Sequence, residues 1–396
     1  MARFDIICAY ALLFYIIFGL YELFATPANH DLISKPLNDL FDKTGLIPKS
    51  HNVQGKYGIN DRVYARDMNN KKTKQTVAQL YHDPIWAPLY PFDYEKDYDP
   101  DPMLDHMKRM NYSYPIICVI LYICMIAPRL LEESDIKAKE KAANAKLTPA
   151  EREAKKKAAD EAKKAAKKKA LENPKAKSFT ALAAWNLFLS LFSAWGMIRT
   201  VPHLIKLITT VSFQETVCLP ASINFGVSAS GLAAQMFCLS KLPELIDTIF
   251  TIVKGKTPIF LHWYHHITVL LYCWNSYVTE SSAGIYFIAM NYTVHAIMYF
   301  YYFMNELGIV PKWFKTELIT SIQLAQMFGG MFIVGSSIHY YYETKGNCSN
   351  QTSTLICGFL MYASYAYLFL EFFIGKYLTG SSQLPAAAAA ETKKSK

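Results

Sequence analysis

The chain has 396 residues, of which 52% are hydrophobic and 18% are charged. This length and apolar balance exclude a single ordinary soluble domain and favour an integral membrane protein. The net charge of +9 does not indicate nucleic-acid binding, because the basic residues are not interleaved with stacking aromatics on a soluble domain.

The chain opens with an apolar stretch from Ile6 to Phe24, which small residues follow directly. Residues 1–25 are therefore predicted to be either a cleaved signal peptide or a retained N-terminal anchor. Residues 26–110 are polar and lack a sustained helical period. We interpret them as a lumenal segment and assign them no function.

Seven further stretches are long and apolar enough for spanning helices, which need about 20 residues to cross a hydrocarbon core of roughly 30 Å. They lie at about 113–131, 179–198, 226–252, 258–276, 284–304, 317–339 and 353–376. The sequence thus predicts an all-α integral membrane fold over residues 111–378, followed by a tail at 379–396.

Positive charge predicts the orientation of these helices. A Lys/Ala-rich insertion at 134–178 follows the first of the seven stretches, and such loops stay on the cytosolic side. The same rule then puts Lys254, Lys256 and the C-terminus in the cytosol. Near the end of the tail, Lys393 and Lys394 resemble a dilysine retrieval signal. We therefore expect a multi-pass protein of the endoplasmic reticulum membrane.

Two of the eight cysteines, Cys218 and Cys348, fall in predicted lumenal loops. Because the lumen is oxidising, we expect them to form a disulfide, with two free thiols as the alternative. Three sequons lie on the same side, at Asn347, Asn350 and Asn111, and are predicted glycosylation sites. Asn111 lies close to the membrane.

Polar residues form stripes inside four of the predicted spans, where they are functional candidates because burial in hydrocarbon costs several kcal/mol. Helical spacing places the members of each stripe on one face. The stripes are Lys241, Glu244, Asp247 and Thr248; His262, His265 and His266; Asn291, His295, Met298, Tyr299 and Tyr302; and Thr320, Gln323 and Gln326. For the first stripe the alternative is an internal ion pair, and for the last a hydrogen-bonded seam between helices.

The stripes form an ordered set of motifs. They read Lys241-x-x-Glu244-x-x-Asp247-Thr248, His262-x-x-His265-His266, Asn291-x-x-x-His295-x-x-Met298-Tyr299-x-Tyr301-Tyr302, and Thr320-x-x-Gln323-x-x-Gln326. This set resembles the ELO family of very-long-chain fatty acid elongases. The stretch from Phe260 to Thr268 looks most like members that elongate saturated and monounsaturated chains. The N-terminal segment and the insertion depart from the family pattern.

The resemblance implies seven helices, six of them closing into a barrel around an acyl tunnel. It also implies an acyltransferase that condenses a long-chain acyl-CoA with malonyl-CoA, releasing carbon dioxide and CoA and leaving a 3-ketoacyl-CoA. No cofactor beyond these substrates and no metal is expected. The expected partners are membrane lipid and the ketoacyl-CoA reductase, dehydratase and enoyl reductase of the elongation cycle.

The resemblance points to His265 as the residue that carries the acyl group. His262 and His266 are expected to position it, and Asp247 to fix a tautomer by accepting a ring N–H. His295 and Asn291 are expected to stabilise the enolate. The predicted substrate-binding residues are Lys241, Lys254 and Lys256, for CoA phosphates, together with Glu244, Tyr299, Tyr302, Gln323 and Gln326.

Two other classes of protein remain as alternatives. A membrane di-iron desaturase or hydroxylase also contains His-x-x-His-His, but it needs about eight histidines in three boxes. This chain has ten histidines, and four of them lie in the N-terminal polar segment. A transporter would also place polar stripes in a barrel, but its inverted repeats are not evident.

Overall fold

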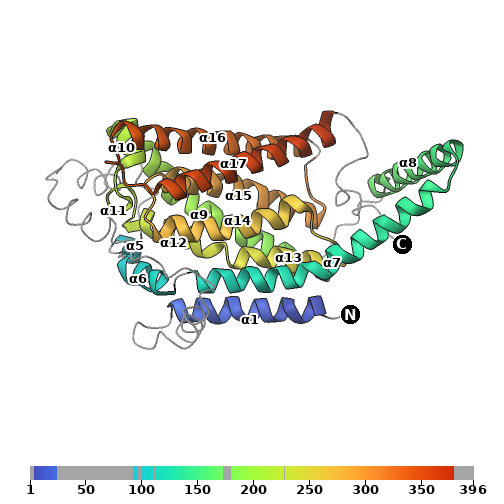
Figure 1. Cartoon of the computed structure of the whole chain (residues 1–396), viewed down its shortest axis with the longest axis horizontal. Coiled ribbons are helices and arrows are strands. Elements are labelled where there is room, and N and C mark those ends of the chain that lie inside the picture. The colour runs from blue at the N-terminus through green and yellow to red at the C-terminus, as the bar shows by residue number, and fades with distance from the viewer. Residues whose placement is uncertain are drawn as a thin grey trace.

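The computed structural model describes residues 4–24, 92–96, 98, 100–110, 112–172, 180–226, 228–311 and 313–378. Asn111, Lys393 and Lys394, together with most of 26–110, lie outside the described residues. Within the described ranges every regular element is a helix (Figure 1). The elements are α1 (Phe4–Phe24), α5 (Asp93–Lys96), α6 (Asp101–Met110), α7 (Ser113–Ala145), α8 (Pro149–Glu172), α9 (Ala181–Thr210), α10 (Phe213–Cys218), α11 (Ala221–Asn224), α12 (Ser228–Ser240), η2 (Pro243–Leu245), α13 (Ile246–Val253), α14 (Phe260–Val278), α15 (Gly284–Leu307), α16 (Thr316–Glu343), α17 (Thr352–Phe373) and η3 (Ile374–Leu378).

Among the described residues, four helices are long and apolar enough to cross a membrane: α7, α9, α16 and the continuous run of α17 and η3. The chain is a multi-pass membrane protein. Helices α14 and α15 lie within the same bundle (Figure 1) and carry the His, Asn and Tyr residues of two predicted stripes.

The helices pack closely where glycine faces an aromatic ring. A Cβ on Gly196 of α9 would lie 2.3 Å from the ring of Tyr292 on α15. A Cβ on Gly330 of α16 would lie 2.5 Å from the ring of Tyr362 on α17. Any larger residue would push these helices apart, so the two glycines allow the close packing of both pairs.

Helix α1 runs antiparallel to α7 along one side of the bundle (Figure 1). Asp5 near its start accepts a hydrogen bond from Arg129 Nε at 2.8 Å. Near its other end, Tyr114 OH lies 3.3 Å from the backbone oxygens of Tyr15 and Ile16. Together with the buried Leu12 and Ile16, these contacts seat α1 on the bundle.

The third predicted span, 226–252, is interrupted. It divides into α12, η2 and α13, with the break at Pro243. A proline inside a helix has no N–H to donate, and its ring clashes with the carbonyl four residues earlier. The prediction of one continuous helix was therefore wrong at this point, and the polar stripe of this span bridges the break.

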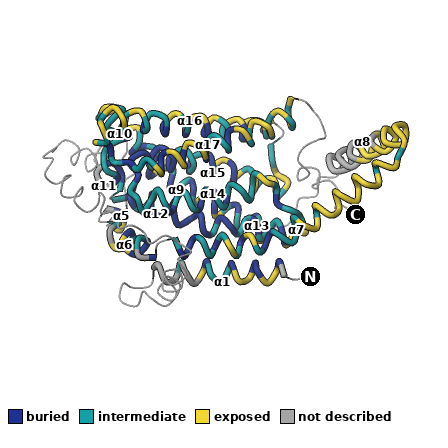
Figure 2. The backbone as a smooth tube through the Cα atoms, viewed as in Figure 1, coloured by how far each residue is buried: buried dark blue, intermediate teal, exposed yellow. Residues whose placement is uncertain are grey.

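The Lys/Ala-rich insertion is helical and projects away from the bundle (Figure 2). Helix α7 continues past the predicted span to Ala145, and α8 starts at Pro149. The start of α8 is stabilised by a capping box, in which Thr148 N donates to Glu151 Oε2 at 2.8 Å and Glu151 N donates to Thr148 Oγ1 at 3.4 Å.

Candidate active site

The three histidines of α14 lie together in the middle of the bundle. The ring centroids of His262 and His266 are 4.5 Å apart, and those of His265 and His266 are 5.5 Å apart. His262 Nε2 also lies 2.9 Å from Thr248 Oγ1 on α13. The spacing of three and four residues therefore gathers the three imidazoles as predicted, and α13 holds one of them by a hydrogen bond.

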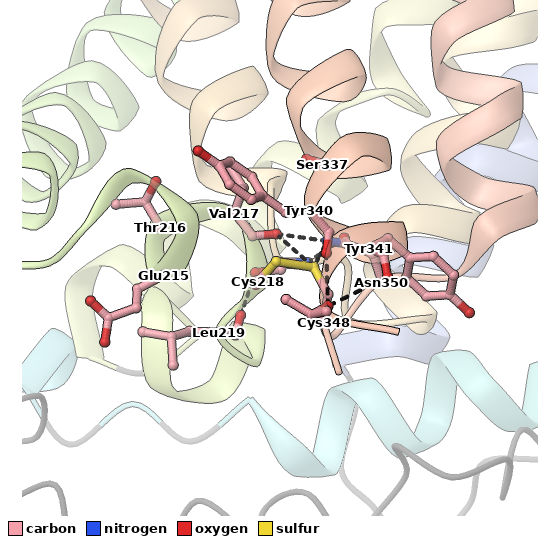
Figure 3. The surroundings of a disulfide bond; sticks show 12 residues. Glu215, Thr216, Val217, Cys218, Leu219, Ser337, Tyr340, Tyr341, Cys348 and Asn350 are labelled. Atoms are coloured by element: carbon pink, nitrogen blue, oxygen red, sulfur yellow. Dashed lines mark hydrogen bonds between the residues drawn. A yellow bond between two sulfur atoms is a disulfide. The ribbon is translucent and has the colours of Figure 1, made fainter. Parts of the chain in front are cut away.

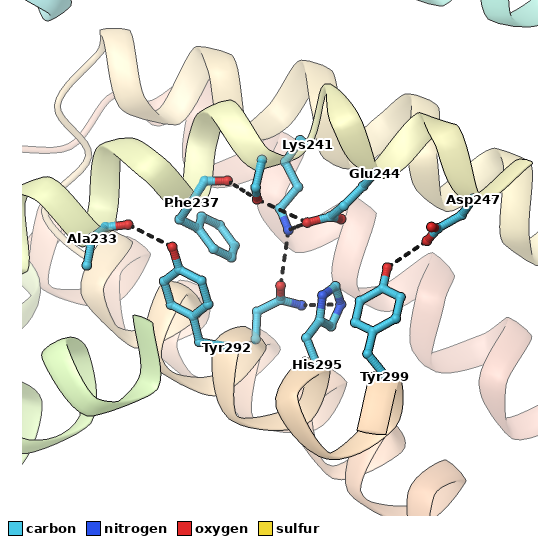
Figure 4. Close-up of polar contacts among 10 residues, drawn as sticks. Ala233, Phe237, Lys241, Glu244, Asp247, Tyr292, His295 and Tyr299 are labelled. Atoms are coloured by element: carbon cyan, nitrogen blue, oxygen red, sulfur yellow. Dashed lines mark hydrogen bonds and ion pairs between the residues drawn. The ribbon is translucent and has the colours of Figure 1, made fainter. Parts of the chain in front are cut away.

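A chain of polar contacts joins α12 and η2 to α15 (Figure 4). Lys241 Nζ lies 2.7 Å from Glu244 Oε1 and donates to Asn291 Oδ1 at 3.3 Å. Asn291 Nδ2 lies 3.2 Å from His295 Nε2. Lys241 and Glu244 are only 2% and 3% exposed, so this is an ion pair inside the protein.

This chain of contacts fixes the tautomer of His295. The Lys241 ammonium is only a donor, so the oxygen of the Asn291 amide faces it and the NH₂ group faces His295. Nε2 of His295 is therefore the acceptor, and the proton of the neutral ring lies on Nδ1. The internal ion pair considered as an alternative for the first stripe is present, and it orients a candidate catalytic residue.

Asp247 does not contact a histidine ring, so the expectation that it fixes a histidine tautomer was wrong. Its Oδ1 accepts a hydrogen bond from Trp185 Nε1 at 2.6 Å, and its Oδ2 accepts one from Tyr299 OH at 2.7 Å. Both carboxylate oxygens are thus engaged by other donors. Asp247 instead holds Tyr299 in place beside His295, whose ring centroid lies 5.4 Å from that of Tyr299 (Figure 4).

A cavity of about 530 Å³ brings the predicted site residues together. All four segments that carry the predicted polar stripes contribute residues to its wall. The predicted residues that line it are Glu244, Asp247, Lys254, Lys256, His262, His265, His266, Asn291, His295, Tyr299, Tyr302, Gln323 and Gln326. Two buried polar atoms of residues in this wall, Glu244 Oε2 and His266 Nδ1, have no hydrogen-bond partner among the described residues. Such unpaired buried groups are uncommon in native proteins.

A second, narrow cavity of about 100 Å³ adjoins the first one. Its wall is mainly apolar, with residues such as Phe237, Val269 and Met361. Four residues line both cavities: His265, Asn291, Gln326 and Met327. We call the large cavity the polar chamber and the small one the apolar channel. His265 lies where the two join, so an amphipathic molecule with its polar head in the chamber and its apolar tail in the channel would have its middle beside His265.

Lys241 is not available for a phosphate, contrary to expectation. It is buried, paired with Glu244, and stacked over the ring of Phe237 with 4.2 Å between Nζ and the ring centroid. The cations at the edge of the large cavity are instead Lys254, Lys256 and Lys376. Lys254 keeps 41% of its side chain exposed while it contacts Glu306 at 2.9 Å.

Four residues at the site were not predicted. Trp185 holds Asp247, and Tyr122 OH lies 2.7 Å from Thr248 Oγ1, the partner of His262. Tyr365 OH lies 3.3 Å from the backbone oxygen of His265, and Lys376 lines the cavity. Trp185 and Tyr122 come from helices without a polar stripe, so the sequence carries no signal for them. The basic charge of Lys376 at a predicted span end was a usable signal.

The other predicted sites lie at the opposite end of the bundle. Cys218 and Cys348 form a disulfide, as expected, which ties the end of α10 to the loop between α16 and α17 (Figure 3). Asn347 beside it is exposed. Asn350 is 6% exposed, and its Nδ2 donates to Val217 O at 2.7 Å. The predicted glycosylation of Asn350 was therefore wrong, because its side-chain nitrogen is buried and engaged.

Comparison with known proteins places this site in context. Residues 108–384 match the model of the ELO family, described as the GNS1/SUR4 family. The chain is 41% identical over 202 residues to fatty acid elongase 2 of Trypanosoma cruzi, covering 50% of this chain and 72% of the relative. It is 40% identical over 197 residues to very long chain fatty acid elongase 6 of Gallus gallus, covering 50% and 73%. It is also 41% identical over 203 residues to very long chain fatty acid elongase 6 of Drosophila melanogaster, covering 50% and 62%.

Proposed function

The chain belongs to the ELO (GNS1/SUR4) family and is an enzyme of fatty acid elongation, and we propose that it condenses a long-chain acyl-CoA with malonyl-CoA. The products are a 3-ketoacyl-CoA two carbons longer, carbon dioxide and free CoA. This makes it an acyltransferase of the very-long-chain 3-oxoacyl-CoA synthase type. The di-iron desaturase alternative is not favoured, because the family match is to elongases.

One observation carries this proposal: His265 lies where the polar chamber meets the apolar channel. An acyl-CoA has a charged, hydrated head and an apolar tail, and its reactive thioester lies between them. With the tail in the apolar channel and the head in the chamber, the thioester carbon lies beside His265. A nucleophile at this junction is therefore in position for acyl transfer.

In the first step, a neutral imidazole nitrogen of His265 attacks the thioester carbonyl. The C–S bond breaks, CoA leaves as a thiolate that takes up a proton, and the acyl group remains on His265 as an acyl-imidazole. His262 and His266 flank the attacking ring. The hydrogen bond between Thr248 Oγ1 and His262 Nε2 orients His262.

In the second step, malonyl-CoA loses carbon dioxide and the resulting enolate carbon attacks the acyl-imidazole. The new C–C bond forms as the C–N bond breaks, and the departing ring nitrogen of His265 takes up the proton that the overall reaction consumes, which restores the neutral imidazole. Asn291 and His295 lie at the same cavity and stabilise the charge on the enolate oxygen. Tyr299, held by Asp247, adds to the polar wall beside His295. The closed apolar surroundings keep water away from the acyl intermediate.

The CoA head binds at the edge of the large cavity that carries three lysines, which we call the lysine rim. Lys254, Lys256 and Lys376 supply positive charge for its phosphates. Tyr302, Gln323 and Gln326 line the chamber between this rim and the histidines, where they contact the polar part of the substrate.

This arrangement supports one orientation in the membrane. The lysine rim faces the cytosol and the disulfide end faces the lumen of the endoplasmic reticulum, with a cytosolic C-terminus. Seven helices form the body, and six of them enclose the acyl tunnel as a barrel. Helices α12 and α13 together act as one of the seven.

The substrates are saturated or monounsaturated acyl-CoAs and malonyl-CoA, with no further cofactor and no metal. Because a 3-ketoacyl product must be reduced, dehydrated and reduced again, the enzyme acts with a ketoacyl-CoA reductase, a dehydratase and an enoyl reductase. Asn347 is a glycosylation site on the lumenal side, supported by the exposure of its side chain, and Asn111, outside the described residues, is a second.

The test is intact-protein mass spectrometry after incubation with palmitoyl-CoA and no malonyl-CoA. The wild-type protein is expected to gain one palmitoyl group, and His265→Ala to gain none. His203→Ala is the control, because His203 is another histidine of the bundle, at 3% exposure, that lies outside both cavities. Adding malonyl-CoA should discharge the adduct and yield the 3-ketoacyl-CoA.

Two results would overturn the mechanism. An adduct that persists in His265→Ala assigns the acyl group to another residue. Iron bound to the purified protein, with desaturated product and no elongated product, would replace the elongase assignment by the di-iron alternative. A metal analysis on the same preparation therefore belongs to the experiment.

A further inference from the structure

The apolar channel follows α14 away from the histidines. Its lining includes His265 at one end and Tyr277, Glu280 and Ser281 at the other. His265 and Tyr277 are twelve residues apart, which is about 18 Å of helix at about 1.5 Å per residue. The channel therefore has the length of a long acyl chain. The volume of the channel, about 100 Å³, is smaller than that of such a chain, so flexible side chains such as Met361 must change rotamer when an acyl chain enters.

The far end of the channel is closed by residues that precede most of the region matched by the family model. Pro100 and Leu104 line it there. Among the described residues we name the segment 92–110, which contains α5 and α6, the cap. The family match begins only at residue 108, so Pro100 and Leu104 come from outside the region that the family model covers. The other residues that line the channel lie inside that region, so only the stop comes from the N-terminal segment.

A buried ion pair holds the start of the cap against α9. Glu95 is 0% exposed and Arg199 is 5% exposed. Arg199 Nε donates to Glu95 Oε1 at 3.0 Å, and NH2 of the same guanidinium lies 2.9 Å from Oε2. Trp195 Nε1 donates to Oε1 as well, at 3.1 Å. This two-pronged pair fixes the direction of the cap as well as its distance from the bundle.

Further contacts hold the rest of the cap over the channel. Tyr98 OH donates to Gln235 of α12, and Tyr98 O accepts a hydrogen bond from Ser228 N at 3.3 Å. Lys108 lies 3.9 Å from Glu280, a residue of the channel end. The cap is therefore fastened to α9, α12 and the turn after α14, which are three sides of the opening that it closes.

We propose that the cap sets the length of the acyl chain that this enzyme accepts, with Leu104 as the stop for its methyl end. The proposal rests on the elongase function proposed above. Leu104 is 4% exposed and projects from α6 into an apolar channel, where a longer chain would collide with it. Beyond it, the polar Glu280 and Ser281 disfavour a methyl group. The end of the channel therefore blocks a longer chain by contact with Leu104, and the polar groups around Leu104 disfavour the burial of a methyl group there.

The test uses two substitutions at one position, one that makes the side chain smaller and one that makes it larger. Leu104→Ala removes the stop and Leu104→Phe enlarges it. Leu207→Ala is the matched control, because Leu207 is a leucine with 3% exposure that does not line the channel. Each full-length protein is incubated with labelled malonyl-CoA and a series of saturated acyl-CoAs of increasing length, and the products are separated by chain length.

Leu104→Ala is expected to raise, by about tenfold, the rate on the acyl-CoA two carbons beyond the longest good substrate of the wild type, because a pocket discriminates about tenfold or more per methylene. Leu104→Phe is expected to lower the rate on that longest substrate by a similar factor and to leave shorter ones unchanged. Leu207→Ala should keep the wild-type profile.

Pro100→Ala provides a second variant at a partly exposed position of the same wall, with the same expected direction as Leu104→Ala, in case a Leu104 variant does not fold. Unchanged chain-length profiles in folded Leu104→Ala and Pro100→Ala, with elongation intact, would overturn the proposal. A wild type that elongates no acyl-CoA would instead overturn the proposed function, so the two failures are distinguishable.

Discussion

Replacing Lys241 with methionine should separate two roles of one side chain. Methionine keeps much of the length and the apolar stem of lysine but removes the charge. Glu244 then loses its partner at 2.7 Å and keeps only Ser240 Oγ at 3.0 Å. Asn291 at the same time loses the donor to its Oδ1, so nothing fixes which end of its amide faces His295.

The effect on stability follows from burial. Lys241 and Glu244 are almost inaccessible, and removing one partner of such a pair costs about 3–5 kcal/mol because the other charge stays buried and uncompensated. At about 2–4 °C per kcal/mol, the melting temperature should fall by roughly 10 °C. Lys241→Met/Glu244→Leu removes both charges and should recover most of this loss. Because each single variant leaves one buried charge unpaired at a cost of about 3–5 kcal/mol and the double variant leaves none, the coupling energy should be roughly 5–9 kcal/mol.

Activity should not recover with stability. In the double variant Asn291 still lacks its donor, so His295 is no longer held in the tautomer with the proton on Nδ1. We expect kcat to stay about 100-fold below wild type, the scale of a lost acid–base group. The measurement is a thermal melt of each variant in the same detergent, with condensation followed by labelled malonyl-CoA at saturating substrate.

Additive melting shifts in the two single variants and the double variant would refute the ion-pair reasoning. Full activity in the double variant would refute the argument that Lys241 acts on His295 through Asn291. Asn291→Asp offers an independent check. The carboxylate has no N–H to donate to His295 Nε2, so the variant should have a lower kcat, while the ion pair between Lys241 and Glu244 stays intact.

The disulfide end supplies two further predictions. Cys218 and Cys348 are separated by 130 residues, so the bond should add up to about 5 kcal/mol by restricting the unfolded chain. Dithiothreitol should lower the melting temperature of the wild type, whereas equal melting curves with and without it would contradict this. Expression in a glycosylating host, with Asn111 replaced by glutamine in every variant, should give a band that shifts on deglycosylation when Asn347 and Asn350 are intact and in Asn350→Gln, but not in Asn347→Gln. A shift lost in Asn350→Gln would contradict the burial of its amide nitrogen, which donates to Val217 O.

Spacing on a helix predicted which residues share a face, and the structure follows that prediction. His262, His265 and His266 lie on one side of α14 because residues three and four apart are neighbours on any α-helix. Their meeting with His295 on another helix was expected from polarity, since two polar stripes in an apolar bundle are most stable when they face each other. The shared cavity is the result.

The partners of individual atoms could not be predicted in the same way. Asp247 was expected to contact a histidine, but Trp185 and Tyr299 occupy its oxygens. Trp185 belongs to α9, for which the sequence predicted no polar stripe, and no periodicity indicates which residue of such a helix turns toward a carboxylate. The register between helices is set by packing, such as that of Gly196 against Tyr292, and is not visible in either helix alone.

Pro243 shows the same limit from another direction. Its effect on a helix is a local property, and the sequence contained that information. How far the helix is interrupted between α12 and α13 depends on the side chains packed around Pro243, which the local sequence does not specify. Ser240 and Lys241 both contact Glu244 across the interruption, so the polar site stabilises a backbone that would otherwise be an unsupported kink.

The disulfide also constrains how the chain can be inserted into a membrane. Two sulfurs can join only if both emerge on the same face of the bilayer, so the chain between Cys218 and Cys348 must cross an even number of times. In the proposed topology that stretch crosses four times, through α12 with α13, α14, α15 and α16, which satisfies this parity. A molecule in which one of these crossings failed during synthesis would hold the two cysteines on opposite faces, where they could not form the bond.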